Sequence, residues 1–349
     1  MDLINTFLNL VFPPFTFFTL LLFLPPFQIF KFFLSLLRFI FSEDVAGKVV
    51  LITGLHQASA RATSLRVREE GACLALAARR EHSLREVADR AQELGSPEVI
   101  TIQADVAKVD DSRRLVEQAV NHFGRLDHLV NNAGIHHASM LEELDDVTNL
   151  RPVMDINFWG SVYTTRFAVP HLRNSGGKII VMSSSNSWLP LPRSSVYNAS
   201  KAAMTALFET LRIELGQDIH ITLVTPGFIE SELTHGKYLR KDGKLVLDED
   251  MRDVQVGVMP VGRAEECAKA IVKGACRGES YVTMPAWFRL THFWKLFCPE
   301  LIEWTYRLFY LTSPGVSPQE AASKKTLDYT GAKKVLYPET IQSTELKTD

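Results

Sequence analysis

The sequence predicts an α/β fold: a doubly wound parallel sheet with helices on both faces, preceded by an N-terminal hydrophobic anchor. Two observations support this prediction. From residue 48 to residue 224, short apolar runs alternate with amphipathic stretches of helical length, which is typical of parallel strands joined by right-handed helical crossovers. At the N terminus, no charged residue occurs between Asp2 and Lys31, a run long enough to cross a bilayer once.

The predicted sheet contains six strands, each a short apolar run. They cover residues 48–53, 73–78, 99–103, 128–130, 179–182 and 219–224, and the helices expected between them cover residues 61–70, 82–94, 113–123, a stretch through Asn157 to about residue 173, and 196–215. Ligands of such sheets bind beyond the carboxyl ends of the strands. Gly54, Asp105, Asn131 and Ser184 fall at those ends.

Composition divides the chain into three segments. We expect a membrane or lipid-droplet anchor over residues 1–41, a large α/β domain over residues 45–312 and a polar, disordered tail over residues 313–349. The formal net charge of −2 gives no reason to expect nucleic acid as a partner. The four cysteines lack the spacing of metal ligands or disulfide pairs, so we expect no metal site and favour reduced thiols.

Tyr197 and Lys201 form the most informative pair in the chain. They are four residues apart, so on a helix both side chains point to the same face. A neighbouring cation favours the phenolate, so we expect the pKa of Tyr197 to fall toward neutral pH, as suits a general acid/base for hydride chemistry at a carbonyl or alcohol. Ser184 ends a predicted strand thirteen residues earlier, where its hydroxyl could hold the substrate oxygen. A Tyr-x-x-x-Lys pair standing alone more often marks a solvated helix face.

The pair does not stand alone. Thr53-Gly54, Asp105, Asn131-Asn132-Ala133-Gly134, Asn157 and Pro226-Gly227 accompany it in the same chain. In their order and spacing these residues resemble the short-chain dehydrogenase/reductase family, from about residue 47 to residue 281. With the apolar N terminus included, the chain is similar to the 11-beta-hydroxysteroid dehydrogenase-like members of that family, the steroleosins. The resemblance implies a Rossmann domain and an oxidoreductase that interconverts a hydroxyl and a carbonyl on a steroid or sterol-like apolar substrate.

The resemblance also implies roles for single residues. Tyr197 would shuttle the proton, Lys201 would lower its pKa and bind the nicotinamide ribose, Ser184 would orient the substrate oxygen, and Asn157 would support a water relay. The residues that would bind the cofactor are Gly54, Gln57, Arg79, Arg80, Asp105, Asn132, Tyr197 and Lys201.

The turn after the first strand departs from the family pattern. The family has three glycines there, but this chain retains Gly54 and carries Ala58 and Ala60 at the other two positions. A methyl group at position 58 competes for space with the pyrophosphate of a dinucleotide. This departure leaves a second hypothesis open, namely a catalytically weak or dead homologue that serves as a surface protein of a lipid droplet or membrane.

The end of the second predicted strand favours NADP over NAD. An NAD enzyme typically has an acidic residue there for the ribose hydroxyls, and this chain has Ala77-Ala78-Arg79-Arg80 instead. Arginine pairs well with a 2′-phosphate. The alternative is a pair of solvated arginines at a strand end.

Two proline pairs interrupt the apolar N terminus, Pro13-Pro14 and Pro25-Pro26. Because proline breaks or kinks a helix, we do not expect one straight spanning helix but a bent or hairpin insertion, as suits the monolayer of a lipid droplet. A single anchor in the endoplasmic reticulum is the alternative. Lys31 and Arg38 follow the apolar run, so positive-inside reasoning places the catalytic domain in the cytosol.

Two later stretches leave alternatives open. Residues 228–261 form an insertion that either covers the substrate or is a surface excursion. Residues 284–311 are dense in aromatic side chains with interleaved Arg289, Lys295 and Arg307. This second stretch fits a helix pair on a membrane surface, the face of a homodimer, or core packing.

Overall fold

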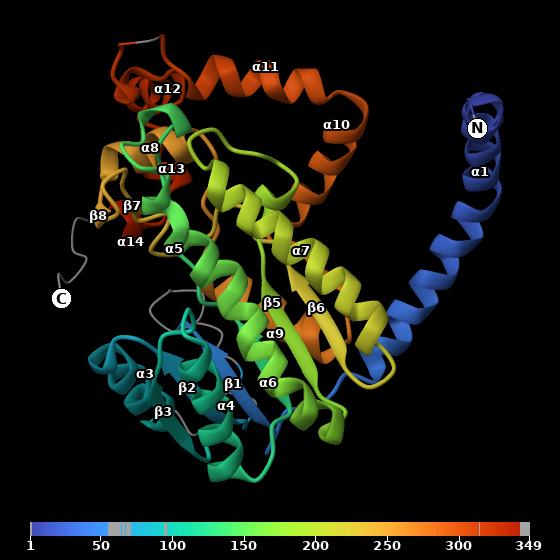
Figure 1. The fold of residues 1–349 in the computed structure, drawn as a ribbon, viewed down its shortest axis with the longest axis vertical. Coiled ribbons are helices and arrows are strands. Elements are labelled where there is room, and N and C mark those ends of the chain that lie inside the picture. The colour runs from blue at the N-terminus through green and yellow to red at the C-terminus, as the bar shows by residue number, and fades with distance from the viewer. Residues whose placement is uncertain are drawn as a thin grey trace. The chain divides into compact units, whose positions relative to one another are not determined.

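The computed structural model describes residues 2–54, 64, 67, 71–93, 96–313 and 315–342 (Figure 1). The chain divides into two compact units, residues 1–43 and residues 44–349. Each unit is described by itself.

The larger unit is built on one parallel sheet of seven strands within its described residues, in the order β3-β2-β1-β4-β5-β6-β9 (Figure 1). The strands are β1 (Val49–Thr53), β2 (Cys73–Ala78), β3 (Val99–Gln103), β4 (His128–Asn131), β5 (Lys178–Met182), β6 (His220–Val224) and β9 (Tyr281–Val282). The predicted fold class is confirmed. Strand β9 was not predicted, because two residues are too short to show a periodic pattern.

Helices cover both faces of this sheet. They are α3 (Glu81–Glu93), α4 (Val109–Phe123), α6 (Gly160–Ser175), α7 (Ser195–Leu215) and α9 (Ala264–Cys276). Strand residues alternate between the faces. Val49 and Leu51 pack with α4, α6 and α7, whereas Val50 and Ile52 pack with α3 and α9. Of the helix expected over residues 61–70, the structure describes Ser64 and Val67, both helical and buried.

The sheet order places the site. From β1 the chain first builds outward through β2 and β3 and then resumes on the other side of β1 with β4. The crevice at the carboxyl ends of β1 and β4 is therefore the switch point at which ligands of this fold bind. The long helix expected through Asn157 is divided into α5 (Arg151–Met154), a π-helical turn at Asp155–Trp159, and α6. Such π turns are frequent at functional sites.

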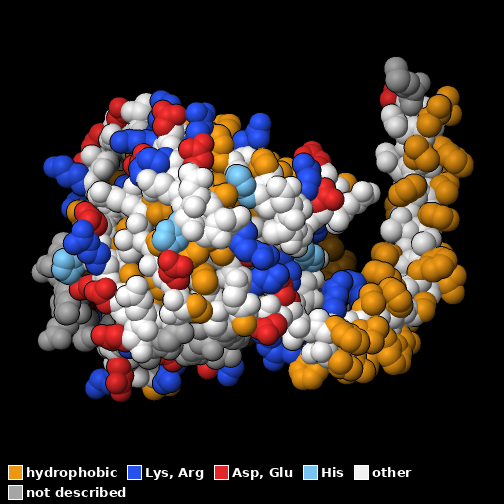
Figure 2. All heavy atoms as spheres, turned by 90° about the horizontal axis from the view of Figure 1, so that it is seen from below, with side chains coloured by type: hydrophobic (Ala, Val, Ile, Leu, Met, Phe, Trp, Pro, Cys, Tyr) orange, Lys and Arg blue, Asp and Glu red, His pale blue; other side chains and the backbone are white. Residues whose placement is uncertain are grey.

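Helix α1 (Asp2–Ile40) forms the small unit; it agrees with the bent alternative of the expectation and corrects the hairpin alternative. It runs unbroken for 39 residues through both proline pairs and has no buried residue. Figure 1 shows it bent, and Figure 2 shows apolar side chains along its length. The hairpin is not observed, because a proline removes one backbone hydrogen bond and bends a helix while the neighbouring turns keep theirs. By length and composition, α1 is the one described helix that could cross a membrane.

The C-terminal segment is a second correction. The polar tail expected to be disordered over residues 313–349 contains α12 (Ala322–Thr330), α13 (Lys333–Leu336) and α14 (Glu339–Gln342). Leu327, Tyr337 and Ile341 are buried against Val256 and Val261. These apolar residues are few and widely spaced, so their burial depends on a partner surface that sequence periodicity does not reveal. Residues 343–349 lie outside the described part of the chain.

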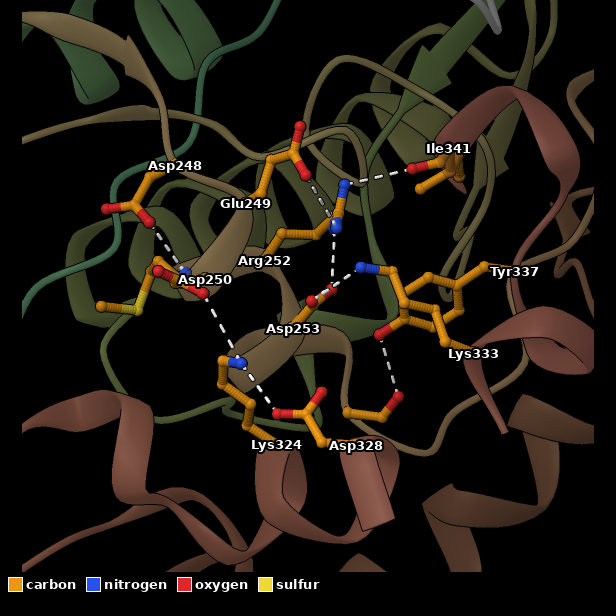
Figure 3. A network of polar contacts seen from close by, with 12 residues as sticks. Asp248, Glu249, Asp250, Arg252, Asp253, Lys324, Asp328, Lys333, Tyr337 and Ile341 are labelled. Carbon is orange, nitrogen blue, oxygen red and sulfur yellow. Dashed lines mark hydrogen bonds and ion pairs between the residues drawn. The ribbon is translucent and has the colours of Figure 1, made fainter. Parts of the chain in front are cut away.

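A polar network holds this segment to α8 (Glu249–Val256) (Figure 3). The guanidinium of Arg252, 2% exposed, donates to Asp253 Oδ1 at 2.9 Å and to the Ile341 carbonyl at 3.1 Å. Lys333 Nζ reaches the other Asp253 oxygen at 2.8 Å. The hydroxyl of Tyr337 donates to the Gly257 carbonyl at 2.9 Å. Burial of these charges is tolerated because each is paired.

The insertion over residues 228–261 packs against the domain instead of extending from it. It contains α8 and a two-stranded ribbon, β7 (Lys237–Leu239) and β8 (Leu245–Leu247). Leu239 bridges to His137, and the ring of Tyr238 lies 5.3 Å from that of His136. Of the two alternatives, a cover beside the predicted site therefore fits better than a surface excursion.

The aromatic stretch forms α10 (Thr291–Phe297) and α11 (Pro299–Tyr310). Phe288 and Tyr310 are buried, so core packing accounts for part of the stretch. Most of its large apolar side chains are exposed: Trp287, Leu290, Phe293, Trp294, Leu296, Phe297, Leu301, Trp304 and Leu308. A lipid-facing surface and a homodimer face remain open as explanations for these.

Candidate active site

Tyr197 and Lys201 lie on the first turns of α7 and are both buried, at 6% and 4% exposure. The Lys201 ammonium donates to the Met182 carbonyl at the end of β5, at 2.7 Å. It lies 5.7 Å from the centre of the Tyr197 ring. The helical spacing therefore places both groups in one interior region, as the sequence predicted, and the end of β5 holds the lysine there.

Ser184 reaches the same region from the loop after β5. Its hydroxyl caps the short helix Ser185–Ser187 by accepting from the Asn186 amide at 3.1 Å. The same hydroxyl is hydrogen-bonded to the phenol of Tyr197, which lowers the tyrosine pKa. Neighbouring Ser183 bonds to the Lys201 carbonyl at 3.1 Å. The hydrogen bonds of Met182 and Ser183 to Lys201 thus hold the end of β5 against the start of α7.

The pKa of Tyr197 departs from the sequence expectation. Burial raises it to about 12, and the bond from Ser184 offsets only part of that rise. Burial also lowers the pKa of Lys201 to about 7. The expected fall toward neutral pH is therefore not found, because desolvation of the buried phenolate is the larger effect and raises the pKa.

Asn157 is fully buried in the π-helical turn. Its Oδ1 accepts from the Ile135 amide at 2.8 Å, and its Nδ2 donates to the Ile135 carbonyl and to Ser200 Oγ, both at 3.0 Å. These bonds tie the loop after β4 to α7. A Cβ on Gly134 would lie 3.3 Å from Asn157 Oδ1 and 3.6 Å from Lys201 Nζ, so this glycine lets both groups approach one point.

The turns after β1 and β4 meet at Gly54 and Asn132. Gly54 has φ +73°, and a Cβ there would lie 2.3 Å from the Cα of Ala133. The Asn132 side chain donates to the carbonyls of Thr53 at 3.2 Å and Gly54 at 3.0 Å. Only glycine fits position 54, because a Cβ there would collide with the backbone of Ala133. Gln57, Ala58 and Ala60 lie outside the described residues.

The crevice contains two pockets. One, with about 540 Å³ of empty volume, is lined by Asn132, Gly134, Met182, Ser183, Ser184, Tyr197, Lys201, Pro226, Gly227, Ile229, Ser231, Leu233 and Cys267. The other, of about 290 Å³, is lined by Gly54, Ala77, Ala78, Arg79, Ala104, Asp105, Val106, Ala133 and Ile156. The predicted catalytic and cofactor residues that the structure describes are therefore brought together along one crevice, except Arg80 and Asn157, which line neither pocket.

Arg79, Arg80 and Asp105 stand at the ends of β2 and β3. Both arginine side chains are exposed, and Arg80 Nη2 pairs with Glu232 at 3.1 Å. Asp105 accepts from the Ala107 amide at 3.1 Å and so shapes the turn after β3. A crevice with a close-approach glycine, an aspartate at the third strand and arginines at the second could hold a dinucleotide.

Sequence reasoning missed two histidines beside Tyr197. The ring of His136 lies 4.2 Å from the Tyr197 ring and stacks on His137. Burial lowers the pKa of His137 to about 4 and holds that of His136 well below its usual value, so both are neutral. Their position directly after the Asn131–Gly134 motif was the available signal.

Known proteins resemble this chain in sequence and in fold. The family model for short chain dehydrogenases matches residues 48–242. A protein of Sesamum indicum named 11-beta-hydroxysteroid dehydrogenase A is 63% identical over 349 residues, covering 100% of both chains. An alcohol dehydrogenase from the archaeon Thermococcus sibiricus, complexed with 5-hydroxy-NADP, is 26% identical at a TM-score of 0.54 and covers 64% of this chain and 88% of its own. A short-chain dehydrogenase/reductase from Burkholderia phymatum in complex with NAD shares the fold, with 24% identity, a TM-score of 0.63, and 72% and 95% coverage.

Proposed function

Because this chain belongs to the short chain dehydrogenase family, we propose that it is an NADP-dependent oxidoreductase that interconverts a hydroxyl and a carbonyl on a steroid or sterol-like apolar substrate. The observation that carries this proposal is the meeting of Ser184, Tyr197 and Lys201 in one buried region at the carboxyl ends of the strands. A bound nicotinamide cofactor supplies or accepts the hydride in such chemistry.

The chain's own residues handle the oxygen and its proton. The Tyr197 hydroxyl gives its proton to a substrate carbonyl oxygen during reduction and becomes the phenolate; during oxidation the Tyr197 phenolate takes the proton from the alcohol and becomes the phenol. Ser184, already bonded to the phenol, holds the same oxygen. Lys201, when protonated, stabilises the phenolate left on Tyr197 and offers its ammonium to ribose hydroxyls. Asn157 positions Ile135 and Ser200 through its three hydrogen bonds, and we propose that it supports a relay of protons to the lysine.

Cofactor choice rests on the end of β2. Arg79 lines the pocket of Gly54 and Asp105, and Arg80 follows it, so two guanidinium groups stand where a 2′-phosphate would be read. The Thermococcus protein was complexed with an NADP derivative and the Burkholderia protein with NAD, so the relatives alone do not decide between the cofactors.

Substrate class is supported by the pocket wall and by the relatives. Met182, Pro226, Ile229 and Leu233 give the pocket an apolar side beside Tyr197. The Sesamum indicum relative is named a hydroxysteroid dehydrogenase. The inactive homologue left open by the sequence gains no support from the described residues, because the four catalytic side chains are retained in one buried region.

For location, we propose attachment to a lipid droplet or to the endoplasmic reticulum membrane, with the catalytic domain in the cytosol. Helix α1 supports it, since none of its residues is buried and nearly all its large apolar side chains are exposed and would otherwise face water. The exposed aromatics of α10 and α11 also fit contact with a lipid surface. Residues 1–41 fused to a fluorescent reporter should localise to one of these membranes, and a diffuse cytosolic signal would refute the attachment.

The acid/base role is tested by Tyr197→Phe. Turnover should fall by about 10²-fold or more, while NADPH affinity, measured by fluorescence titration, stays nearly unchanged because the phenol acts on the proton. Tyr329→Phe, at a side chain 94% exposed on α12, is the matched control and should keep full activity. Near-normal turnover of Tyr197→Phe would rule out the mechanism.

A further inference from the structure

An ion pair crosses from the end of β2 to the insertion that covers the site. Arg80 Nη2 lies 3.1 Å from Glu232 Oε1, and Lys237 Nζ lies 3.0 Å from the same oxygen. The Glu232 side chain is 20% exposed and that of Arg80 43%. One carboxylate therefore occupies a guanidinium that the proposed function assigns to the cofactor.

The segment that carries Glu232 borders the pocket of Tyr197 and reaches the end of β2. Its neighbours Ser231 and Leu233 line the pocket that contains Tyr197 and Lys201. The carboxylate of Glu232 reaches Arg80, which follows Arg79 of the other pocket. A single turn of chain thus lines the pocket of Tyr197 through Ser231 and Leu233, and its carboxylate pairs with Arg80 at the end of β2.

This turn is internally braced. Thr234 Oγ1 donates to the Ile229 carbonyl at 2.9 Å and accepts from the Ser231 amide, also at 2.9 Å. Thr234 and Ser231 are buried. Because the backbone around Glu232 is held in this way, the carboxylate is presented to Arg80 from a fixed position, and Lys237 stays within its reach.

We propose that Glu232 is a specificity-determining residue that occupies Arg80 in the empty enzyme and releases it to the 2′-phosphate of NADP. This inference rests on the proposed NADP function. A phosphate monoester carries about −1.5 to −2 charges at neutral pH, whereas the Glu232 carboxylate carries one. The phosphate therefore displaces Glu232 from the Arg80 guanidinium. Lys237 then neutralises Glu232. NADH has no such phosphate and leaves the ion pair in place.

It follows that Glu232 lowers the affinity of the protein for NADPH by a measurable amount. Removing the carboxylate frees Arg80 beforehand and removes a negative charge beside the phosphate. Because Arg80 is partly exposed and the pair is screened, we expect Glu232→Gln to tighten NADPH by about three- to tenfold at low salt, and less at high salt. NADH affinity should change less than twofold, since no part of NADH contacts Arg80.

The test is fluorescence titration of NADPH and NADH with the full-length protein in detergent micelles. Four proteins are compared: the wild type, Glu232→Gln, Arg80→Ala and the double variant. If Glu232 acts through Arg80, its substitution should change NADPH affinity in the wild-type background and not in the Arg80→Ala background. Glu266→Gln, an exposed carboxylate on α9, controls for the change in net charge and should leave both affinities unaltered.

The outcomes separate this inference from the proposed function. If Arg80→Ala weakens NADPH but Glu232→Gln leaves it unchanged or weaker, the inference is overturned while NADP specificity stands. If Arg80→Ala affects neither cofactor, or affects both equally, then the arginine does not read the 2′-phosphate and the assignment of Arg80 fails together with the role of Glu232. Equal tightening of NADPH and NADH by Glu232→Gln would also overturn the inference, because it would reflect general charge.

Discussion

Gly54 and Gly124 together allow a sharp test of how the turn after β1 is built. Gly54 has φ +73°, and a Cβ there would lie 2.3 Å from the Cα and 2.7 Å from the amide nitrogen of Ala133. Both are backbone atoms, so no side-chain rotation relieves the collision. Gly124 ends α4 with φ +74°, yet nothing lies within 4 Å of a Cβ at that position. The pair therefore separates backbone strain from steric collision.

The two alanine variants should differ by the collision alone. Gly124→Ala carries the strain of the left-handed conformation, about 1–2 kcal/mol. Gly54→Ala adds overpacking of about 1–3 kcal/mol, so its total is roughly 2–5 kcal/mol. At roughly 2 °C per kcal/mol for a domain of this size, Tm should fall by about 2–4 °C for Gly124→Ala and about 4–10 °C for Gly54→Ala.

The assay is thermal unfolding of the full-length protein in detergent, followed by an NADPH titration of each variant. Gly54→Ala should also weaken NADPH, because displacement of the turn moves Asn132, whose side chain binds the Gly54 carbonyl. Gly124→Ala should bind NADPH as the wild type does. Equal falls in Tm would refute the reasoning, since they would mean that the loop at Ala133 yields without cost.

Two further predictions concern buried charges. Asp253→Ala removes the hydrogen-bonded carboxylate of the buried Arg252 guanidinium and leaves it only the longer ion pair with Glu249, at 3.5 Å. The variant should cost about 3–5 kcal/mol in urea unfolding. Asp328→Ala breaks the pair between a 54% exposed carboxylate and Lys324 and should cost less than about 1 kcal/mol; similar shifts in the two variants would contradict this difference. Lys201→Met should raise the free energy of unfolding most below pH 7, and this gain should shrink as the pH rises toward 10.5. The reason is that the folded lysine loses its proton near pH 7 whereas the unfolded lysine keeps it. A gain independent of pH between 6 and 10 would show that burial does not perturb the pKa of Lys201.

Some of the molecule follows from local pattern. Strands β2 and β3 begin and end at the residues that the apolar runs predicted. For β2 the reason is that a parallel strand covered on both faces is a continuous apolar segment, whereas β3, at the edge of the sheet, exposes Thr101 and Gln103. The spacing of Tyr197 and Lys201 placed both on one face of α7, since a helix brings residues four apart together. Ser184 was predicted to close its strand, and it lies just past Met182, the last residue of β5.

The state of ionisation did not follow from pattern. The helical spacing indicated a cation near Tyr197, and we therefore expected the pKa of Tyr197 to be lowered. The structure buries both groups, so desolvation dominates and the pKa of Tyr197 rises to about 12. Sequence shows which charges are neighbours along a helix, whereas exclusion of water depends on the elements packed around them, here including His136 and the covering insertion.

The sequence by itself determined six of the seven strands that the structure describes, the crevice at their carboxyl ends, the shared helix face of Tyr197 and Lys201, and the apolar N terminus, because each depends on residues close in the chain or on a repeated period. Only the tertiary structure showed that the C-terminal segment is folded into helices and that Arg80 pairs with Glu232. Leu327 and Ile341 are buried only because α8 offers them a surface. Arg80 and Glu232 are 152 residues apart, and no local period records which distant carboxylate a folded chain places beside a guanidinium.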